Sequence, residues 1–254
     1  MTNFLDLSGQ TVVVTGGNNG IGLGMARGLA QAGASVAIWG RNAERNQQAV
    51  EELGKLSEVA AFTCDVSDPR QVDEAMAGTL AKFGHLNGLI ANAGISGTKA
   101  PFHEIPIEDF RKVAAVNVDG VVLSFQAAIK QMIKQGKGGS LVAVSSLAGI
   151  EGAGGNLPYG ATKGAVLAIM RGVATEYGRH GIRSNAILPG WIATDMTSKA
   201  VGNEVFTEKV IKRVPFRRWG TPEDFAAAAV YLVGPGSTYT NGQQFVIDGG
   251  YSVF

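Results

Sequence analysis

Two side chains suited to acid–base chemistry, Tyr159 and Lys163, lie four residues apart in a segment of helical composition. With a rise of ~1.5 Å per residue, they would share one helix face about 6 Å apart along the axis. A free tyrosine has a pKa near 10, so proton transfer near neutral pH requires a shift of about 3 units, or ~4 kcal/mol in favour of the phenolate. A neighbouring ammonium favours the phenolate, so the pair could form a proton donor, although this spacing also arises by chance on exposed helix faces.

Two further polar residues belong to the same pattern. Ser146 follows the apolar run Ser140–Val144 and precedes Tyr159 by thirteen residues, and Asn117 lies on the preceding helical segment. Ser145 is the neighbour most easily mistaken for Ser146, which we select because of its spacing from Tyr159. This context favours a shared site over a chance pair.

A glycine-rich segment follows the first apolar run, Val12–Val14. It contains Gly16, Asn18, Asn19, Gly20, Ile21 and Gly22, and a helical pattern begins there. In the order strand, glycine-rich turn and helix, backbone N–H groups and the helix dipole face a pyrophosphate, which can approach only where side chains are absent. The spacing is Gly-x-x-x-Gly-x-Gly and not Gly-x-Gly-x-x-Gly, so a tight turn without a ligand is the alternative.

The end of the second apolar run indicates which dinucleotide would bind. A fold that prefers NAD usually places Asp or Glu here to bind the ribose 2′-hydroxyl. This chain has Gly40 followed by Arg41, whose guanidinium suits a 2′-phosphate. The alternative is a solvated loop arginine, but the missing acid and the present base together favour NADP over NAD.

Short apolar runs alternate with longer helical patterns from end to end, which predicts an α/β fold: a single doubly wound Rossmann domain with a seven-stranded parallel sheet. The expected strands are Thr11–Thr15, Ser35–Trp39, Val59–Thr63, Gly88–Ala91, Ser140–Val144, Arg183–Leu188 and Gln244–Ile247. Helices are expected from Ile21 to Ala32 and near 43–56, 68–83, 107–135, 156–179 and 221–233. No linker divides residues 1–254. The excursion at about 193–218 breaks the rhythm and is either a substrate-binding lid or a helical insertion packed on the core.

Composition excludes several classes of protein. The 254 residues carry a net charge of +1, which argues against nucleic-acid and membrane-surface partners. Glycine is frequent, 36 residues, without a collagen period. The single cysteine, Cys64, forms no intramolecular disulfide, and the three histidines are isolated, so no metal site is expected. No signal peptide or apolar run of membrane length is evident, so we expect a cytoplasmic protein.

With these motifs, the chain resembles the short-chain dehydrogenase/reductase family over essentially its whole length. Thr15–Gly22 is similar to the family's cofactor loop, and Asn92, Ala93 and Gly94 match its Asn-Asn-Ala-Gly motif, in which Ala91 replaces the first asparagine. The other matching positions are Asp65 and Val66 beside the adenine, the tetrad Asn117, Ser146, Tyr159 and Lys163, and Pro189, Gly190, Ile192 and Thr194 beside the nicotinamide carboxamide.

The resemblance implies a role for each member of the tetrad. Tyr159 would be the general acid in reduction and the base in oxidation, and Ser146 would polarise the substrate carbonyl. Lys163 would bind the nicotinamide ribose and, with the oxidised nicotinamide, lower the pKa of Tyr159. Asn117 would hold a water that resupplies the proton. The resemblance also implies a homotetramer.

These observations predict an NADP(H)-dependent carbonyl reductase or alcohol dehydrogenase that acts on a small ketone or secondary alcohol. Within the family the sequence looks most like 3-oxoacyl-carrier-protein reductases and the sugar-acid and polyol dehydrogenases. One alternative is an NAD-dependent sugar-acid or polyol dehydrogenase of the same fold. Another, from a different class, is a non-catalytic dinucleotide-binding sensor or scaffold, against which the complete tetrad argues.

Overall fold

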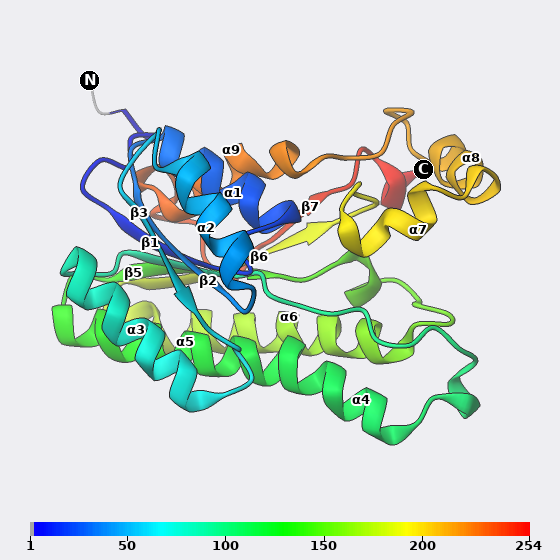
Figure 1. The fold of residues 1–254 in the computed structure, drawn as a ribbon, viewed down its shortest axis with the longest axis horizontal. Helices are drawn as coiled ribbons and strands as arrows, with labels where there is room; N and C mark the ends of the chain where they lie inside the picture. The colour runs from blue at the N-terminus through cyan, green and yellow to red at the C-terminus, as the bar shows by residue number, and fades with distance from the viewer. Residues whose placement is uncertain (1–2) are drawn as a thin grey trace.

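A computed structural model describes residues 3–254 of the chain (Figure 1). Its strands are β1 (Thr11–Thr15), β2 (Ser35–Gly40), β3 (Val59–Thr63), β4 (Gly88–Ala91), β5 (Gly139–Val144), β6 (Ile182–Pro189) and β7 (Gln244–Ile247). All neighbouring strands pair in parallel, in the order β3-β2-β1-β4-β5-β6-β7. The expected seven-stranded parallel sheet is confirmed, and each strand boundary lies within one residue of its predicted position.

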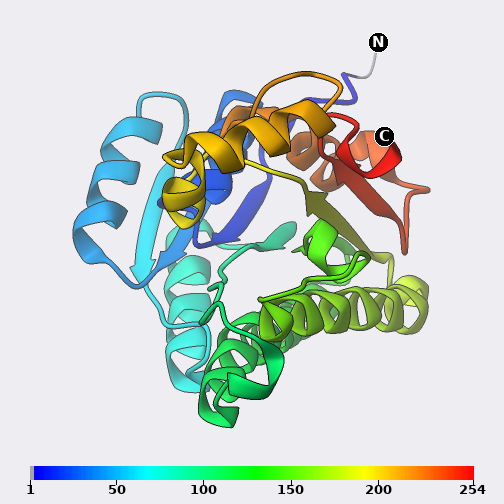
Figure 2. The same ribbon diagram turned by 90° about the vertical axis from the view of Figure 1, so that its right-hand side faces the viewer.

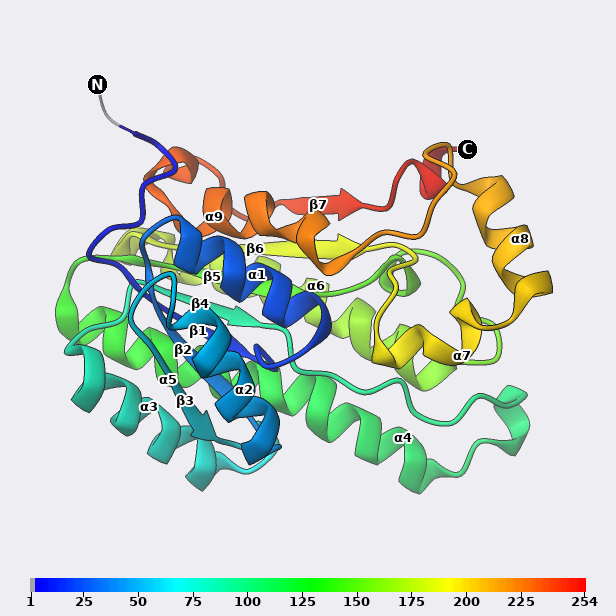
Figure 3. The same cartoon turned by 45° about the horizontal axis from the view of Figure 1, so that its top comes forward.

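Helices cover both faces of this sheet (Figures 1 and 3). They are α1 (Gly20–Gln31), α2 (Ala43–Leu53), α3 (Pro69–Phe83), α4 (Ile107–Ala114), α5 (Gly120–Gln135), α6 (Leu157–Tyr177), α7 (Ser198–Val201), α8 (Glu204–Arg213) and α9 (Ala226–Val233). Along β1 the side chains alternate between two apolar cores: Val13 packs with residues of α3, α5 and α6, and Val12 and Val14 with those of α1, α2 and α9. Burial on both faces explains why these strands are continuously apolar.

The strand order reverses direction at β1, which fixes where a ligand can bind. The chain proceeds from β1 to β2 and β3 on one side, and then returns to place β4 on the other side of β1. The connections that follow β1 and β4 therefore leave the sheet in opposite directions and open a crevice at the carboxyl ends of the strands.

The segment 107–135, predicted as one helix, is helical throughout but contains an irregular turn. A π-helical turn, Ala115–Asp119, separates α4 from α5 and contains Asn117. The predicted helix near 107–135 is confirmed, whereas the π-helical turn within it was not predicted, because an added i→i+5 turn leaves the apolar periodicity on either side almost unchanged.

The same segment, Ile107–Gln135, is long and apolar enough to cross a membrane by length and composition. Half of its most apolar window is buried inside the protein, however, and Val121, Phe125 and Met132 of α5 belong to the apolar core beneath the sheet. These contacts are those of a core helix in a globular domain.

The excursion at 193–218 is mostly helical. It contains α7 and α8, which lie beyond the carboxyl ends of β6 and β7 (Figures 1 and 3), and Figure 2 views this end of the molecule. Val210 and Val214 are buried, whereas Met196, Val205 and Phe216 are exposed. The excursion is therefore packed on the core only in part, and its role as a lid over a ligand stays a prediction.

Candidate active site

A cleft of about 410 Å³ follows the carboxyl edge of the sheet from the end of β2 to α6. Its volume is in the range of small-molecule and cofactor sites. Most of the predicted site residues line it: Gly16, Asn18, Asn19, Gly20, Ile21, Arg41, Asp65, Val66, Asn92, Ala93, Gly94, Ser146, Tyr159, Lys163, Pro189, Gly190, Ile192 and Thr194. The structure thus brings together residues from nearly the whole chain. Gly22 and Asn117 lie behind this surface.

The glycine-rich turn leaves backbone exposed at the start of α1. Gly16 and Gly20 adopt left-handed φ angles of 63° and 52°, which favour glycine. A Cβ on Gly22 would lie 2.2 Å from the Gly16 carbonyl oxygen, so any larger residue would force the turn open. The side chain of Asn19 caps α1 by accepting a hydrogen bond from the Gly20 N–H. Bare backbone at a helix N-terminus fits the pyrophosphate of a dinucleotide.

Asn92 fastens this turn to the neighbouring strand β4. Its side-chain amide donates to the carbonyl oxygens of Thr15 and Gly16 at 3.0 and 3.2 Å. The backbone N–H groups of Asn92 and Ala93 both donate to the buried Thr15 hydroxyl at 3.0 Å. These bonds fix the conformation of the glycine-rich turn in the protein itself, which would reduce the entropy lost if a ligand binds there.

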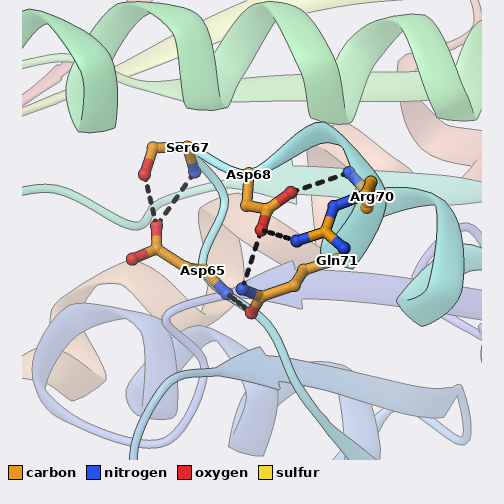
Figure 4. A network of polar contacts seen from close by, with 5 residues as sticks. All are labelled: Asp65, Ser67, Asp68, Arg70 and Gln71. Atoms are coloured by element: carbon orange, nitrogen blue, oxygen red, sulfur yellow. Dashed lines mark hydrogen bonds and ion pairs between the residues drawn. The ribbon is translucent and has the colours of Figure 1, made fainter.

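Asp65 is held rigidly at the far end of the cleft (Figure 4). One carboxylate oxygen accepts hydrogen bonds from the N–H and hydroxyl of Ser67, at 3.0 and 2.6 Å. The backbone N–H of Asp65 donates to Gln71 at 2.8 Å. Burial opposes ionisation, but the Ser67 hydrogen bonds and the Arg41 charge outweigh it, so the pKa of Asp65 lies below its usual value. Its other oxygen lies 3.7 Å from the Arg41 guanidinium.

Tyr159, Ser146 and Lys163 converge at the opposite end of the cleft. Tyr159 and Lys163 come from α6, where the four-residue spacing places them on one face, and the Lys163 ammonium lies 5.5 Å from the centre of the Tyr159 ring. The Ser146 hydroxyl lies close enough to Tyr159 to favour its phenolate form. A Cβ on Gly94 would lie 3.5 Å from the Lys163 ammonium, so the turn after β4 closes directly over this group.

Burial is the largest influence on the pKa of Tyr159. In the protein alone this pKa is raised above the usual value, because burial penalises the phenolate more than the nearby Ser146 hydroxyl favours it. Burial also lowers the pKa of Lys163 to about 8, and its ammonium donates a 2.8 Å hydrogen bond to the Val144 carbonyl. The sequence-based prediction assigns the lowering of the Tyr159 pKa to Lys163 together with the oxidised nicotinamide, and it stays a prediction; in the protein itself the Lys163 hydrogen bond is directed at the backbone.

The buried lysine should cost the fold stability in a pH-dependent way. The folded pKa of about 8 lies below the usual lysine pKa of 10.5, so charged Lys163 destabilises the folded state fully below pH 8, and this cost disappears as the pH rises toward 10.5. We expect Lys163→Met to raise the free energy of unfolding by about 1–3 kcal/mol at neutral pH. Denaturant titrations across this pH range should show the difference vanish near its upper end, whereas the exposed control Lys130→Met should show no such trend.

Ser145 and Asn117 have structural contacts. The Ser145 side chain is 2% exposed and donates to the Lys163 carbonyl at 2.8 Å. Asn117 is fully buried; its amide accepts from the Ile95 N–H and donates to the Ile95 carbonyl and to the Thr162 hydroxyl, at 2.8, 3.0 and 3.1 Å. These bonds join the segment after β4 to α6 at the π-helical turn, and the water-holding role of Asn117 stays a prediction.

Several residues that line the cleft were not predicted from the sequence. Arg45 is the third residue of α2, and Asp195, Met196 and Thr197 begin the excursion. The Arg41-x-x-x-Arg45 spacing carried a signal for a second cation, whereas nothing in the sequence around Asp195 indicates which element it approaches. Within residues 3–254, no group of three His, Cys, Asp or Glu side chains is arranged to hold a metal ion.

Comparisons with known proteins support a nucleotide-dependent oxidoreductase. A family model described as enoyl-(acyl carrier protein) reductase matches residues 16–252. The chain is 39% identical to gluconate 5-dehydrogenase of Gluconobacter oxydans, over 99% of this chain and 98% of the relative. It is 35% identical to 5-keto-D-gluconate 5-reductase of Escherichia coli, over 100% and 99% of the two chains. The crystal structure of a Burkholderia cenocepacia gluconate 5-dehydrogenase in complex with NADP and tartrate superposes with a TM-score of 0.92 at 33% identity, covering 99% and 98% of the two chains.

Proposed function

Because the chain belongs to the short-chain dehydrogenase/reductase family of oxidoreductases, we propose that it transfers a hydride between NADP(H) and a ketone or secondary alcohol, with Tyr159 as the general acid and base. The observation that carries the proposal is one cleft lined both by the glycine-rich turn and Arg41 and by Tyr159, Ser146 and Lys163. That arrangement supports a dinucleotide lying along the cleft.

Different residues of the cleft would bind different parts of the cofactor. The backbone from Gly16 to Gly22 would hold the pyrophosphate, Asp65 and Val66 would flank the adenine, and Arg41 would bind the 2′-phosphate. Gly94, Lys163 and the stretch Pro189–Thr194 would hold the nicotinamide riboside. When bound in its reduced form, the nicotinamide supplies the hydride.

The protein's own groups handle the proton. In reduction the Tyr159 hydroxyl would donate its proton to the substrate oxygen, and its raised pKa keeps that proton in place until the oxygen becomes basic. The Ser146 hydroxyl, which lies near Tyr159, would hold the same oxygen. The Lys163 ammonium would offset the charge left on the phenolate. In oxidation each proton moves in the reverse direction.

The relatives named for gluconate and 5-keto-gluconate chemistry support polyhydroxylated ketones and sugar acids as the first substrates to test. The exposed start of the excursion, Asp195–Thr197, forms part of the cleft wall and would contribute to the choice among them. We also propose that the enzyme works as a cytoplasmic homotetramer in which long helices pair between subunits. Light scattering should then give a mass four times that of the chain.

Cofactor preference provides the test of the NADP assignment. The Arg41 side chain is 61% exposed, so Arg41→Ala should fold normally. A guanidinium–phosphate hydrogen bond contributes about 1.5–3 kcal/mol, so the Kd for NADPH should rise about 10- to 100-fold while that for NADH changes little. Arg70→Ala is the matched control, because Arg70 lies near Asp65 but does not line the cleft (Figure 4). Equal effects of Arg41→Ala on both cofactors would refute the assignment.

A further inference from the structure

The excursion is joined to the cofactor cleft through one carboxylate oxygen. Oδ2 of Asp195 accepts a 2.8 Å hydrogen bond from the side-chain amide of Asn19 and lies 3.0 Å from the guanidinium of Arg45. Asn19 belongs to the phosphate turn, Arg45 to α2, and Asp195 to the first turn of the excursion. Three elements far apart in the sequence thus meet at a single negative charge.

Arg45 projects from the same corner of the fold as Arg41. Asn42 caps α2: its side-chain oxygen accepts a hydrogen bond from the backbone N–H of Arg45. Arg41 therefore directly precedes the cap, and Arg45 lies in the first turn of the helix. Both line the cleft beside Asn18 and Asn19. The N-terminus of this 11-residue helix adds partial positive charge to the two guanidinium groups. Arg41 was predicted as the one cation for a 2′-phosphate, and the structure adds Arg45 beside it.

Each arginine is paired with a carboxylate, but the two carboxylates differ in how firmly they are held. Asp65 is fixed by Ser67, lies 3.7 Å from Arg41, and its side chain is 31% exposed. The Asp195 side chain is 65% exposed, and both of its side-chain contacts are to residues of the cofactor cleft. An exposed ion pair of this kind is worth less than about 1 kcal/mol, so a ligand of higher charge can displace it.

We propose that Arg45 is a second determinant of the preference for a 2′-phosphate and that Asp195 is its internal competitor. This inference rests on the proposed use of NADP. A phosphate bound at Arg41 and Arg45 would take over the contacts that Asp195 makes to Arg45 and Asn19, because a dianion with three acceptor oxygens satisfies a bidentate guanidinium better than one carboxylate oxygen does. The first turn of the excursion would then be released from α2 by NADP and stay tied with NAD.

A purely structural role for the Asp195 contacts can be distinguished from competition with a phosphate. If the Asp195 contacts only organise the cleft, their removal should weaken all nucleotides equally. If Asp195 competes with phosphate, its removal should strengthen binding of nucleotides that carry a 2′-phosphate and leave the others unchanged. The two roles predict changes of opposite sign.

The experiment compares 2′,5′-ADP with 5′-AMP, which differ only in the 2′-phosphate, by isothermal titration calorimetry on the full chain. Arg45→Gln should weaken 2′,5′-ADP binding about 10-fold or more, the effect of losing one charge-assisted contact. Asp195→Asn should tighten it about 2- to 5-fold, in line with the loss of one exposed competing ion pair of less than about 1 kcal/mol. Neither variant should change the Kd for 5′-AMP. In the double variant, the Kd for 2′,5′-ADP should equal that of Arg45→Gln alone, because Asp195 then has no Arg45 to compete for. Glu204→Gln is the control within the excursion, because Glu204 is exposed and forms no ion pair within residues 3–254.

Three results distinguish the possible failures. Equal changes for both nucleotides in Arg45→Gln and Asp195→Asn would overturn the inference and leave the pair with a structural role. Weaker 2′,5′-ADP binding in Arg41→Ala but not in Arg45→Gln would overturn the inference alone. A wild-type protein that binds 5′-AMP as tightly as 2′,5′-ADP, and that Arg41→Ala does not alter, would overturn the proposed NADP use and the inference with it.

Discussion

Replacing Tyr159 with phenylalanine is expected to lower kcat for ketone reduction about a thousandfold, because general acid catalysis contributes between about 10²- and 10⁴-fold. The substitution removes one hydroxyl and keeps the ring that packs beside Lys163. Since the phosphate turn and Arg41 lie at the other end of the cleft, the Kd for NADPH should change no more than a few-fold. Steady-state kinetics and fluorescence titration with NADPH measure the two effects separately.

The matched control for Tyr159→Phe is Tyr177→Phe. Tyr177 ends the same helix, α6, about 27 Å farther along the axis at ~1.5 Å per residue. It should retain full turnover. If Tyr159→Phe kept more than about a tenth of the wild-type kcat, proton donation would have to come from another group, and the assignment of Tyr159 would fail.

The second large effect is expected at Ser146 and not at its neighbour. Ser146→Ala removes a hydroxyl that lies near Tyr159 and would hold the substrate oxygen, so kcat should fall about 10²- to 10³-fold, as for the loss of one donor to a developing negative charge. Ser145→Ala removes a buried hydrogen bond to the Lys163 carbonyl, so it should cost about 1 kcal/mol of unfolding free energy and keep most of the turnover.

The same two variants can contradict this assignment. Steady-state kinetics and urea denaturation give kcat and the free energy of unfolding for each variant. We expect kcat to fall in Ser146→Ala and the free energy of unfolding to fall in Ser145→Ala. Loss of turnover in Ser145→Ala alone would show that the two roles are exchanged. Equal loss in both would show that the turn after β5 acts as one unit.

The fold was predictable because its signal is local and repeated. The runs from Thr11 to Thr15 and from Ser140 to Val144 are apolar on both faces, which only a strand covered by helices on both sides explains. The interruption at Ala115–Asp119 was not predictable, because the apolar residues of α4 and α5 keep nearly the same helical spacing on either side of it. The observed π turn places Asn117 against Ile95 and Thr162.

The site was predictable where a motif fixes a backbone, and less so where the chemistry depends on burial and tertiary contacts. Gly16 and Gly20 require left-handed backbone, so their residue type revealed their position. The pKa of Tyr159 depends on how far α6 is buried, which a four-residue spacing does not show. The partnership of Arg45 with Asp195 joins residues 150 positions apart in the sequence and follows only from the way the excursion crosses the cleft.

The central claim, hydride transfer to a ketone, is tested most directly by following the hydride itself. The wild-type protein would be incubated with NADPH deuterated at the transferable position and a panel of keto sugars and sugar acids, 3-keto esters and diketones, and the products analysed by mass spectrometry and NMR. We expect at least one member to become a secondary alcohol with deuterium on its carbinol carbon, faster than with deuterated NADH. Tight binding of NADPH with no oxidation by any member of the panel would contradict the account and favour a protein that senses the dinucleotide without turnover.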